Sequence, residues 1–227
     1  MEQLRTKLSD RLLMVASLVK KGEKVADIGT DHAYLSAYLV TKGISPKAIA
    51  SDVAEGPLKN AEKIVINAKL KDYITLRLSD GLDNISPDEA DTFIFAGMGG
   101  TLITSLLQKT EWIKTKGKRF IFQPMSHSED VIEFLINNGF EIDKEKSCFD
   151  EKRCYIAFSA VYTGGKKQYS PEFPYVGLLP SQDSDSSRFF IEKQYRHLKK
   201  RYDALTKADI KEDERNKLKE ILDKIKF

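Results

Sequence analysis

The chain has 227 residues, of which 41% are hydrophobic and 31% are charged, and its net charge is +3. These values are typical of a globular protein with a core and exclude a polycation, so that any nucleic-acid surface must be a local patch. No apolar run approaches the ~20 residues that span a bilayer, and residues 1–5 lack the apolar core of a signal peptide, which predicts a cytoplasmic protein without membrane contact. Two cysteines and three scattered histidines have no metal-ligand spacing, so we expect no metal.

Strand-like and helical patterns alternate along the first 140 residues. A helix with an apolar stripe is predicted over residues 6–20, capped by Thr6 or Ser9. The alternation that follows predicts a mostly parallel sheet covered by helices on both faces. Strands are expected at 24–28, 47–51, 74–78, 92–96 and 118–123, and helices at 32–41, 57–69, 100–109 and 129–138.

Two further strands, 140–148 and 153–161, follow each other directly and are expected to form an antiparallel pair at one edge of the sheet. An α/β sheet that ends in such a hairpin is the plan of the seven-stranded, Rossmann-like class I methyltransferase fold. Flavodoxin-like and dehydrogenase sheets lack the final hairpin.

The character of the chain changes after the polar, glycine-bearing loop at 163–168. We expect a methyltransferase domain over residues 1–165 and a helical part over 166–227. Apolar residues recur there at heptad spacing, and a break near 208–209 predicts an antiparallel helical hairpin that is too short to stand free and docks on the domain or on a partner. The apolar positions are Ile191, Tyr195, Leu198, Tyr202 and Leu205 in the first helix, and Ile210, Leu218, Ile221 and Ile225 in the second.

The first predicted strand ends in a turn with one glycine, Gly29, between Asp27 and Asp31. Nucleotide-type ligands bind at the carboxyl end of the first strand in sheets of this class. The fingerprint Gly-x-Gly-x-x-Gly is absent, and two carboxylates would repel a pyrophosphate. They suit a ligand that carries an ammonium group and a ribose, which predicts S-adenosylmethionine; an ordinary βα turn is the alternative.

The ends of the second and third strands also carry acids. Asp52, followed by Val53, lies about 20 residues beyond the glycine turn, where a ribose would bind, and a helix-capping aspartate is the alternative. Asp80 and Gly81 close the third strand, where an adenine amino group would meet the protein, and a plain Asp-Gly turn is the equal alternative.

The fourth strand ends in Ala96, Gly97, Met98, Gly99 and Gly100. Three glycines in four residues cost chain entropy and are tolerated where another group approaches the backbone closely. At this position in the sheet we expect that group to be the methyl donor and the acceptor base, whereas a tight turn would need one glycine.

Two side chains near the same edge have competing interpretations. Gln123, at the tip of the fifth strand, would read a base edge or cap the following helix. His32, at a helix start, would act as a base, as an aromatic lid or as a structural histidine.

Basic residues gather in two places. Lys193, Arg196 and Lys200 are predicted to share one helix face, and such a patch binds phosphates, although a solvated helix face is equally compatible. A second basic region contains Arg5, Lys7, Arg11, Lys20 and Lys21.

With these motifs in hand, the chain resembles the bacterial tRNA (adenine-22-N1)-methyltransferase family, TrmK. The resemblance covers residues 4 to about 160, and the C-terminal helices fit it as well. One departure is Ser36, where the family often has proline. The motifs that carry the resemblance are residues 8–12, 27–35, 51–53, 56–58, 80–82, 96–100 and 123–125.

The resemblance implies methyl transfer from S-adenosylmethionine to N1 of adenine in the D-arm region of tRNA. N1 has a free lone pair at neutral pH, so the enzyme mainly aligns it with the methyl group, and the base must be unpaired or flipped out. We expect Asp31 to stabilise the cationic product, His32 to position the base, and Tyr34 and Met98 to pack against it. We expect Arg11 and Gln123 to contact the substrate.

Other functions stay open on the residues alone. A methyltransferase for a small molecule or a protein, an inactive RNA-binding module and a nicotinamide dehydrogenase are the competing readings. The missing dinucleotide fingerprint disfavours the last, and the intact acidic positions disfavour the second. We expect the protein to be a monomer that binds tRNA.

Overall fold

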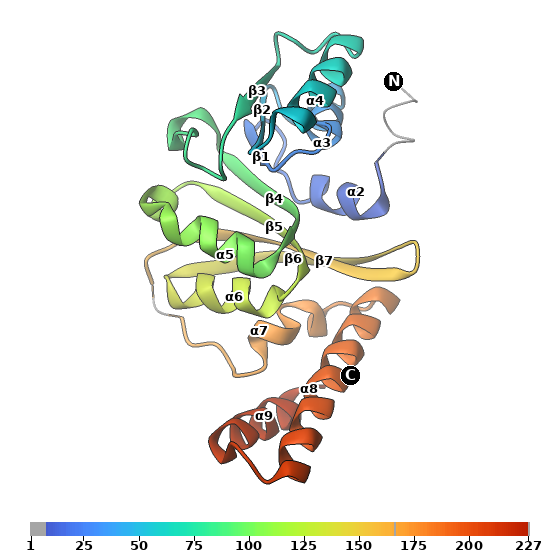
Figure 1. The fold of residues 1–227 in the computed structure, drawn as a ribbon, viewed down its shortest axis with the longest axis vertical. Helices are drawn as coiled ribbons and strands as arrows, with labels where there is room; N and C mark the ends of the chain where they lie inside the picture. Colours follow the sequence, from blue (N-terminus) through green and yellow to red (C-terminus); the bar gives the residue numbers. More distant parts are fainter. Residues whose placement is uncertain (1–7, 166, 227) are drawn as a thin grey trace.

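The computed structural model describes residues 8–165 and 167–226, and its centre is one seven-stranded sheet of order β3-β2-β1-β4-β5-β7-β6 (Figure 1). Strands β1 to β5 run parallel, and β7 pairs antiparallel with both β5 and β6. The predicted fold class and edge hairpin are therefore confirmed. The strands are β1 Val25–Ile28, β2 Ala48–Asp52, β3 Ile74–Leu78, β4 Thr92–Gly99, β5 Arg119–Ser126, β6 Phe140–Asp150 and β7 Arg153–Tyr162.

Helices cover both faces of the sheet (Figure 1). One face packs against α2 Asp10–Ala16, α3 Tyr34–Thr41 and α4 Glu55–Asn67, and the other against α5 Gly100–Lys109, α6 Ser128–Asn137, α7 Phe173–Val176 and α8 Asp185–Ala208. Helix α9, Glu212–Lys224, pairs with α8. Short 3-10 turns occupy Pro87–Glu89, Glu111–Lys114 and Leu179–Ser181.

Several boundaries differ from the predicted ones for local reasons. Strand β4 runs on through Gly99 because the glycine segment keeps pairing with β5, with register shifts around Met98. Helix α4 begins before Pro57, because proline is tolerated in a first helical turn. Helix α2 is capped by Ser9 as expected but already ends at Ala16; the predicted cap Thr6 and the basic residues Arg5 and Lys7 lie outside the described residues.

Helix α8 of the C-terminal helical hairpin packs on β6 and β7, so the hairpin docks on the domain, which is one of the two predicted alternatives. Its seam residues Ile191, Leu198, Leu218 and Ile221 are buried and continue the core of that face of the sheet. Ile210, which was predicted to belong to the second helix, instead lies in the turn between α8 and α9 and is 50% exposed. The division of the chain into domains at 165/166 stays a prediction.

The segment that leads into α8 is held by Glu145 on β6, a contact that no local pattern announced. The Glu145 carboxylate accepts a hydrogen bond from the Leu178 amide (2.5 Å), and its backbone carbonyl accepts one from Gln182 (2.9 Å). Burial raises the pKa of Glu145 to about 8, because the charged form loses its water. The start of α8 is thus tied to the sheet by a carboxyl group that is protonated at neutral pH.

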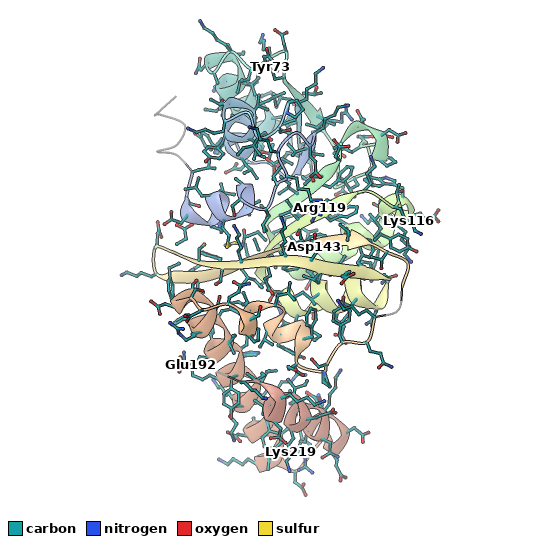
Figure 2. The ribbon with its side chains drawn as sticks, turned by 180° about the vertical axis from the view of Figure 1, so that it is seen from behind. Tyr73, Lys116, Arg119, Asp143, Glu192 and Lys219 are labelled. Atoms are coloured by element: carbon teal, nitrogen blue, oxygen red, sulfur yellow. The ribbon has the colours of Figure 1, made fainter. Side chains whose placement is uncertain are left out.

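An ion pair between a buried arginine and a more exposed aspartate crosses the antiparallel edge of the sheet. Arg119 on β5 reaches over β7 to Asp143 on β6, with Nη1–Oδ2 and Nη1–Oδ1 distances of 2.7 and 2.8 Å, and Ser159 on β7 donates to the same carboxylate (Figure 2). Asp143 is the extra residue of a β-bulge, which turns its side chain toward Arg119. This pair fixes the position of the hairpin that the C-terminal helices use as a platform.

Candidate functional site

The carboxyl ends of β3, β2, β1 and β4 lie side by side at one edge of the sheet (Figure 1). In that spatial order, the row contains Asp80, which follows β3, then Asp52, Asp27 and Ala96. Four predicted cofactor positions from four separate motifs are therefore brought together. The topology places them where open α/β sheets bind their ligands.

Asp27 is the most enclosed acid of this row. Its carboxylate is 4% exposed and accepts hydrogen bonds from the hydroxyls of Thr30 (2.8 Å) and Ser36 (3.2 Å). Burial raises the pKa of Asp27 to about 6, against the opposing effect of the two hydroxyls. The neighbouring carboxylate of Asp52 contributes to this raised pKa. Asp27 therefore fixes the turn from within while it borders the cavity.

The turn after β1 requires its glycine. Gly29 has φ of +73°, and a Cβ there would lie 2.1 Å from the terminal methyl of Met98. Ala33, which precedes α3, is also left-handed (φ +54°), and its amide donates to the Thr30 hydroxyl (3.1 Å). Thr30 thus ties Asp27 to the start of α3 and holds an unfavourable backbone conformation at the site.

A cavity of about 300 Å³ opens between this turn and the end of β4. Asp31, His32 and Tyr34 line one side, and Arg11 and Gly97 line the other. The His32 Nε2 atom lies 3.3 Å from the Asp31 Oδ2 atom, and the His32 and Tyr34 rings are 5.5 Å apart. The Asp31 side chain is 81% exposed and therefore faces anything that enters. Of the residues predicted to act on the substrate, the structure brings Asp31, His32, Tyr34 and Arg11 together at this cavity, whereas Met98, Lys193, Arg196 and Lys200 do not line it.

Gln123 needs a correction. Its side chain is fully buried; its Oε1 atom accepts from the Arg11 guanidinium and from the Gly97 amide (3.0 Å), and its Nε2 donates to the Pro124 carbonyl (3.1 Å). These bonds use both the oxygen and the nitrogen of the buried amide. The prediction that Gln123 hydrogen-bonds to the edge of a base was therefore wrong. Gln123 instead positions Arg11, whose guanidinium also lies 5.8 Å from the centre of the Tyr155 ring.

The ends of β2 and β3 are more open. The Asp52 carboxylate accepts from the Ala54 amide (2.9 Å), and the following Val53 side chain is 67% exposed. Asp80 lies 3.6 Å from Lys109 on α5 and is half exposed, and Gly81 adopts φ of +58°. Hydrogen-bond acceptors and an exposed apolar side chain thus adjoin the acidic row.

The three glycines after Ala96 have different surroundings and therefore different structural roles. Gly97 has φ of +83° and lines the cavity, as expected of a residue that a ligand approaches. Gly100 instead makes room for the backbone, because a Cβ there would lie 2.0 Å from the His127 carbonyl oxygen at the start of α6. A Cβ on Gly99 would make an ordinary contact of 3.4 Å with Ser126. The expectation that all three admit ligand was therefore too broad.

The predicted basic residues of α8 border different hollows of the surface. Lys193 lines a groove between α8 and the tip of β5, whereas Arg196 lines a separate hollow with Arg188, Glu192 and Tyr195. Lys200 is exposed and borders neither. All three lie on α8 at spacings of three and seven residues and therefore share one helix face as predicted, and their binding of phosphates stays a prediction.

Three hydroxyl residues of the site were missed by the sequence reasoning. Thr30 and Ser36 bind the Asp27 carboxylate, and Ser51 donates to the Asp27 carbonyl (3.4 Å). A threonine three residues after a strand-ending aspartate was the available signal. Ser36, noted only as a departure from the family pattern, proves to be an internal partner of Asp27.

Neither a metal-ligand cluster nor a membrane-spanning helix is found among the described residues. Nowhere in 8–165 and 167–226 do three His, Cys, Asp or Glu side chains gather as a metal ion would need. None of the helices in the same ranges has the length and apolarity to cross a membrane.

Comparison with known proteins gives consistent matches. Residues 8–158 match a family model described as a methyltransferase domain. The chain is 32% identical over 226 residues to the tRNA (adenine(22)-N(1))-methyltransferase of Bacillus subtilis (strain 168), covering 97% of this chain and 95% of that protein. The crystal structure of the B. subtilis m1A22 tRNA methyltransferase TrmK is similar with a TM-score of 0.81, 30% identity and 96% of both chains covered. A candidate tRNA (m1A22) methyltransferase of Streptococcus pneumoniae, solved in complex with S-adenosyl-L-methionine, gives 0.80 and 32% over 95% of this chain and 99% of that one.

Proposed function

The chain belongs to the tRNA (adenine-22-N1)-methyltransferase family, and we propose that the cavity between β1 and β4 is where it methylates N1 of adenine 22 in tRNA with S-adenosylmethionine. The observation that carries this proposal is the convergence of Asp31, His32 and Gly97 on one cavity beside the acidic row of strand ends.

The residues at this edge fit S-adenosylmethionine. When bound, it supplies a methyl group activated by a sulfonium centre. The Gly29 turn leaves its backbone open, and the nearby acids complement a cationic ligand. Asp52 would accept the ribose hydroxyls, while Val53, Asp80 and Gly81 would border the adenine. Ala96, Gly97, Met98 and Gly99 would form the opposite wall.

The acceptor side needs alignment and not a strong base, because the N1 lone pair of adenine is free at neutral pH. Asp31 would stabilise the positive charge that develops on the ring, and its exposure leaves the carboxylate available to the base. His32 is held beside Asp31, and Tyr34 lies next to His32, so the two rings would position the adenine. N1 lies on the Watson–Crick edge, so the nucleotide must leave its stack to reach them.

Arg11 is a positioning residue in this proposal. Gln123 holds both its guanidinium and the Gly97 amide, so these two parts of one cavity wall are fixed relative to each other. The side of the guanidinium that faces the cavity would meet a phosphate of the entering strand.

We further propose that the protein acts in the cytoplasm as a monomer without a metal. The apolar seams of α8 and α9 are buried within the chain itself, which supports a monomer. Sedimentation at micromolar concentration should give a single species of 25.8 kDa, and a dimer would contradict the proposal.

The experiment that tests the activity uses unmodified tRNA transcripts, S-adenosylmethionine and mass spectrometry of nuclease digests. We expect one N1-methyladenosine at position 22 and none in a transcript with guanine there. Cofactor binding without tRNA methylation would contradict the proposal and favour a different acceptor or an inactive module.

A further inference from the structure

A second, larger hollow adjoins the proposed catalytic cavity. This groove, of about 550 Å³, lies between the tip of β5, the turn of the β6–β7 hairpin and α8. The residues that line it and bear on its chemistry are Met125, Glu129, Lys152, Arg153, Phe189 and Lys193. None of the methyl-transfer chemistry described above uses it.

The groove and the catalytic cavity share a wall. Tyr155 lines the groove, and Arg11, whose guanidinium lies 5.8 Å from the centre of the Tyr155 ring, lines the cavity. The pairing of β5 with β7 ends at Phe122 and Phe158, so the start of β7 runs on beyond the paired part of the sheet, toward the edge where the cavity opens. A strand that leaves the cavity over Arg11 would therefore enter the groove.

Aromatic and apolar side chains are exposed around it. Phe189 on α8 is 40% exposed, Phe149 on β6 is 43% exposed, and their rings meet edge to face with centres 5.4 Å apart. Met125, at the tip of β5, is 41% exposed. Large apolar side chains that gather on a surface mark a binding site, and aromatic faces stack on nucleobases of any sequence.

The cations of the groove lack the ion-pair partners that four of the six other cations of α8 have, Lys200 and Lys207 being the two without one among the described residues. Lys152, Arg153 and Lys193 are exposed, and in the part of the chain that the structure describes none of them forms an ion pair. Glu129 is the single acid among the lining residues that are described. By contrast, four cations elsewhere on α8 are paired with acids: Arg188, Arg196, Lys199 and Arg201.

We propose that this groove binds an unpaired tRNA nucleotide next to the flipped adenine, with its base against Phe189 and Phe149 and its phosphate at Lys193 and Arg153. The inference rests on the proposed function, since it names where the substrate is held during methylation. Free positive charge beside exposed aromatic rings is the combination that single-stranded nucleic acid requires. A protein partner would not need it.

The test measures binding of fluorescein-labelled, unmodified tRNA transcript to the full chain by anisotropy, together with kcat for methylation at saturating tRNA. Phe189→Ala should raise the Kd for tRNA by about tenfold, because one stacking contact is lost, and leave kcat within about twofold. Phe189→Tyr keeps an aromatic face and should bind as wild type. Tyr73→Ala is the matched control, because Tyr73 is 50% exposed at the far end of the molecule from the helical hairpin (Figure 2).

The outcomes separate this inference from the proposed function. If wild type methylates adenine 22 but Phe189→Ala binds tRNA as wild type does, the groove proposal is overturned and the function stands. An equal loss in Tyr73→Ala also overturns it, because the effect would then not belong to the groove. If tRNA binding depends on Phe189 but wild type does not methylate, the groove is supported and the function fails.

Discussion

The region around the strand ends and the groove under α8 differ in whether their polar and charged groups find partners within the protein. At the row, polar groups are satisfied within the protein: Asp27 by Thr30 and Ser36, and Gln123 by Arg11 and Gly97. At the groove, the cations are exposed and unpaired among the described residues. A prearranged region suits chemistry that depends on alignment, and an unsatisfied region suits the capture of a polyanion.

The largest effect is expected from a substitution in the prearranged region, at Asp31. Asp31→Asn should lower the single-turnover rate of methyl transfer by about 10²-fold, since a neutral amide cannot stabilise the charge that develops on adenine. The affinity for S-adenosylhomocysteine, measured by calorimetry, should stay within about threefold. Asp31→Glu is the control that keeps the charge. A normal rate in Asp31→Asn would remove the assignment.

The internal bonds of the same region can be broken at Gln123. Gln123→Leu leaves the Gly97 amide and the Arg11 guanidinium without their acceptor, so unfolding free energy should fall by about 1–3 kcal/mol and kcat/KM by about tenfold. Denaturant unfolding and steady-state kinetics measure both. Gln123→Glu retains an accepting oxygen and should be milder; equal damage in the two variants would argue against a positioning role.

Glu145, which holds the segment that leads into α8, should make the stability of the fold depend on pH. Glu145 has a pKa of about 8 in the folded chain and 4.5 as its ordinary value, so between these limits the folded chain holds a proton that the unfolded chain releases. Stability should therefore fall as pH rises from about 4.5 to 8.

Melting temperatures at pH 6.5 and 8 lie above the pKa of Asp27, which is about 6, and the difference between wild type and Glu145→Gln isolates the contribution of Glu145. Glu145→Gln should flatten this dependence. Glu220→Gln, at an exposed position on α9, should leave it unchanged. A wild-type slope in Glu145→Gln would contradict the assignment.

The smallest effect is expected from the removal of one unpaired cation of the groove, Lys193. Lys193→Gln should weaken tRNA binding a fewfold and reduce the slope of log Kd against log salt by about one, since one phosphate contact is lost. Lys219→Gln removes the same charge from the exposed side of α9 and should keep the wild-type slope (Figure 2). Equal slopes for the two variants would mean that the groove cations are ordinary surface charges.

The two regions also differ in how far the sequence predicts them. The strand ends are local: each acid or glycine directly follows its own apolar run, and the alternation of strands and helices dictates that those runs end at one edge. Asp27, Asp52 and the Ala96–Gly97 turn were therefore placed correctly.

The remaining features depend on contacts between distant parts of the chain. Gln123 meets Arg11 across 112 residues, and Gly100 is required by the carbonyl of His127. The groove exists because α8 packs beside the hairpin turn, so that Lys193 lines it while Arg196 borders another hollow. Helical periodicity shows which residues of α8 share a face, but not which of the neighbouring elements that face meets.

The central claim is that chemistry and RNA capture reside in separate regions, and a double-mutant cycle on kcat/KM tests it most directly. Asp31→Asn, Phe189→Ala and the double variant would be compared with wild type on the same tRNA transcript. If chemistry and RNA capture reside in separate regions, the two fold-losses should multiply, with a coupling below about 0.5 kcal/mol. A double variant no worse than Asp31→Asn alone would contradict it, because both residues would then act in the same step.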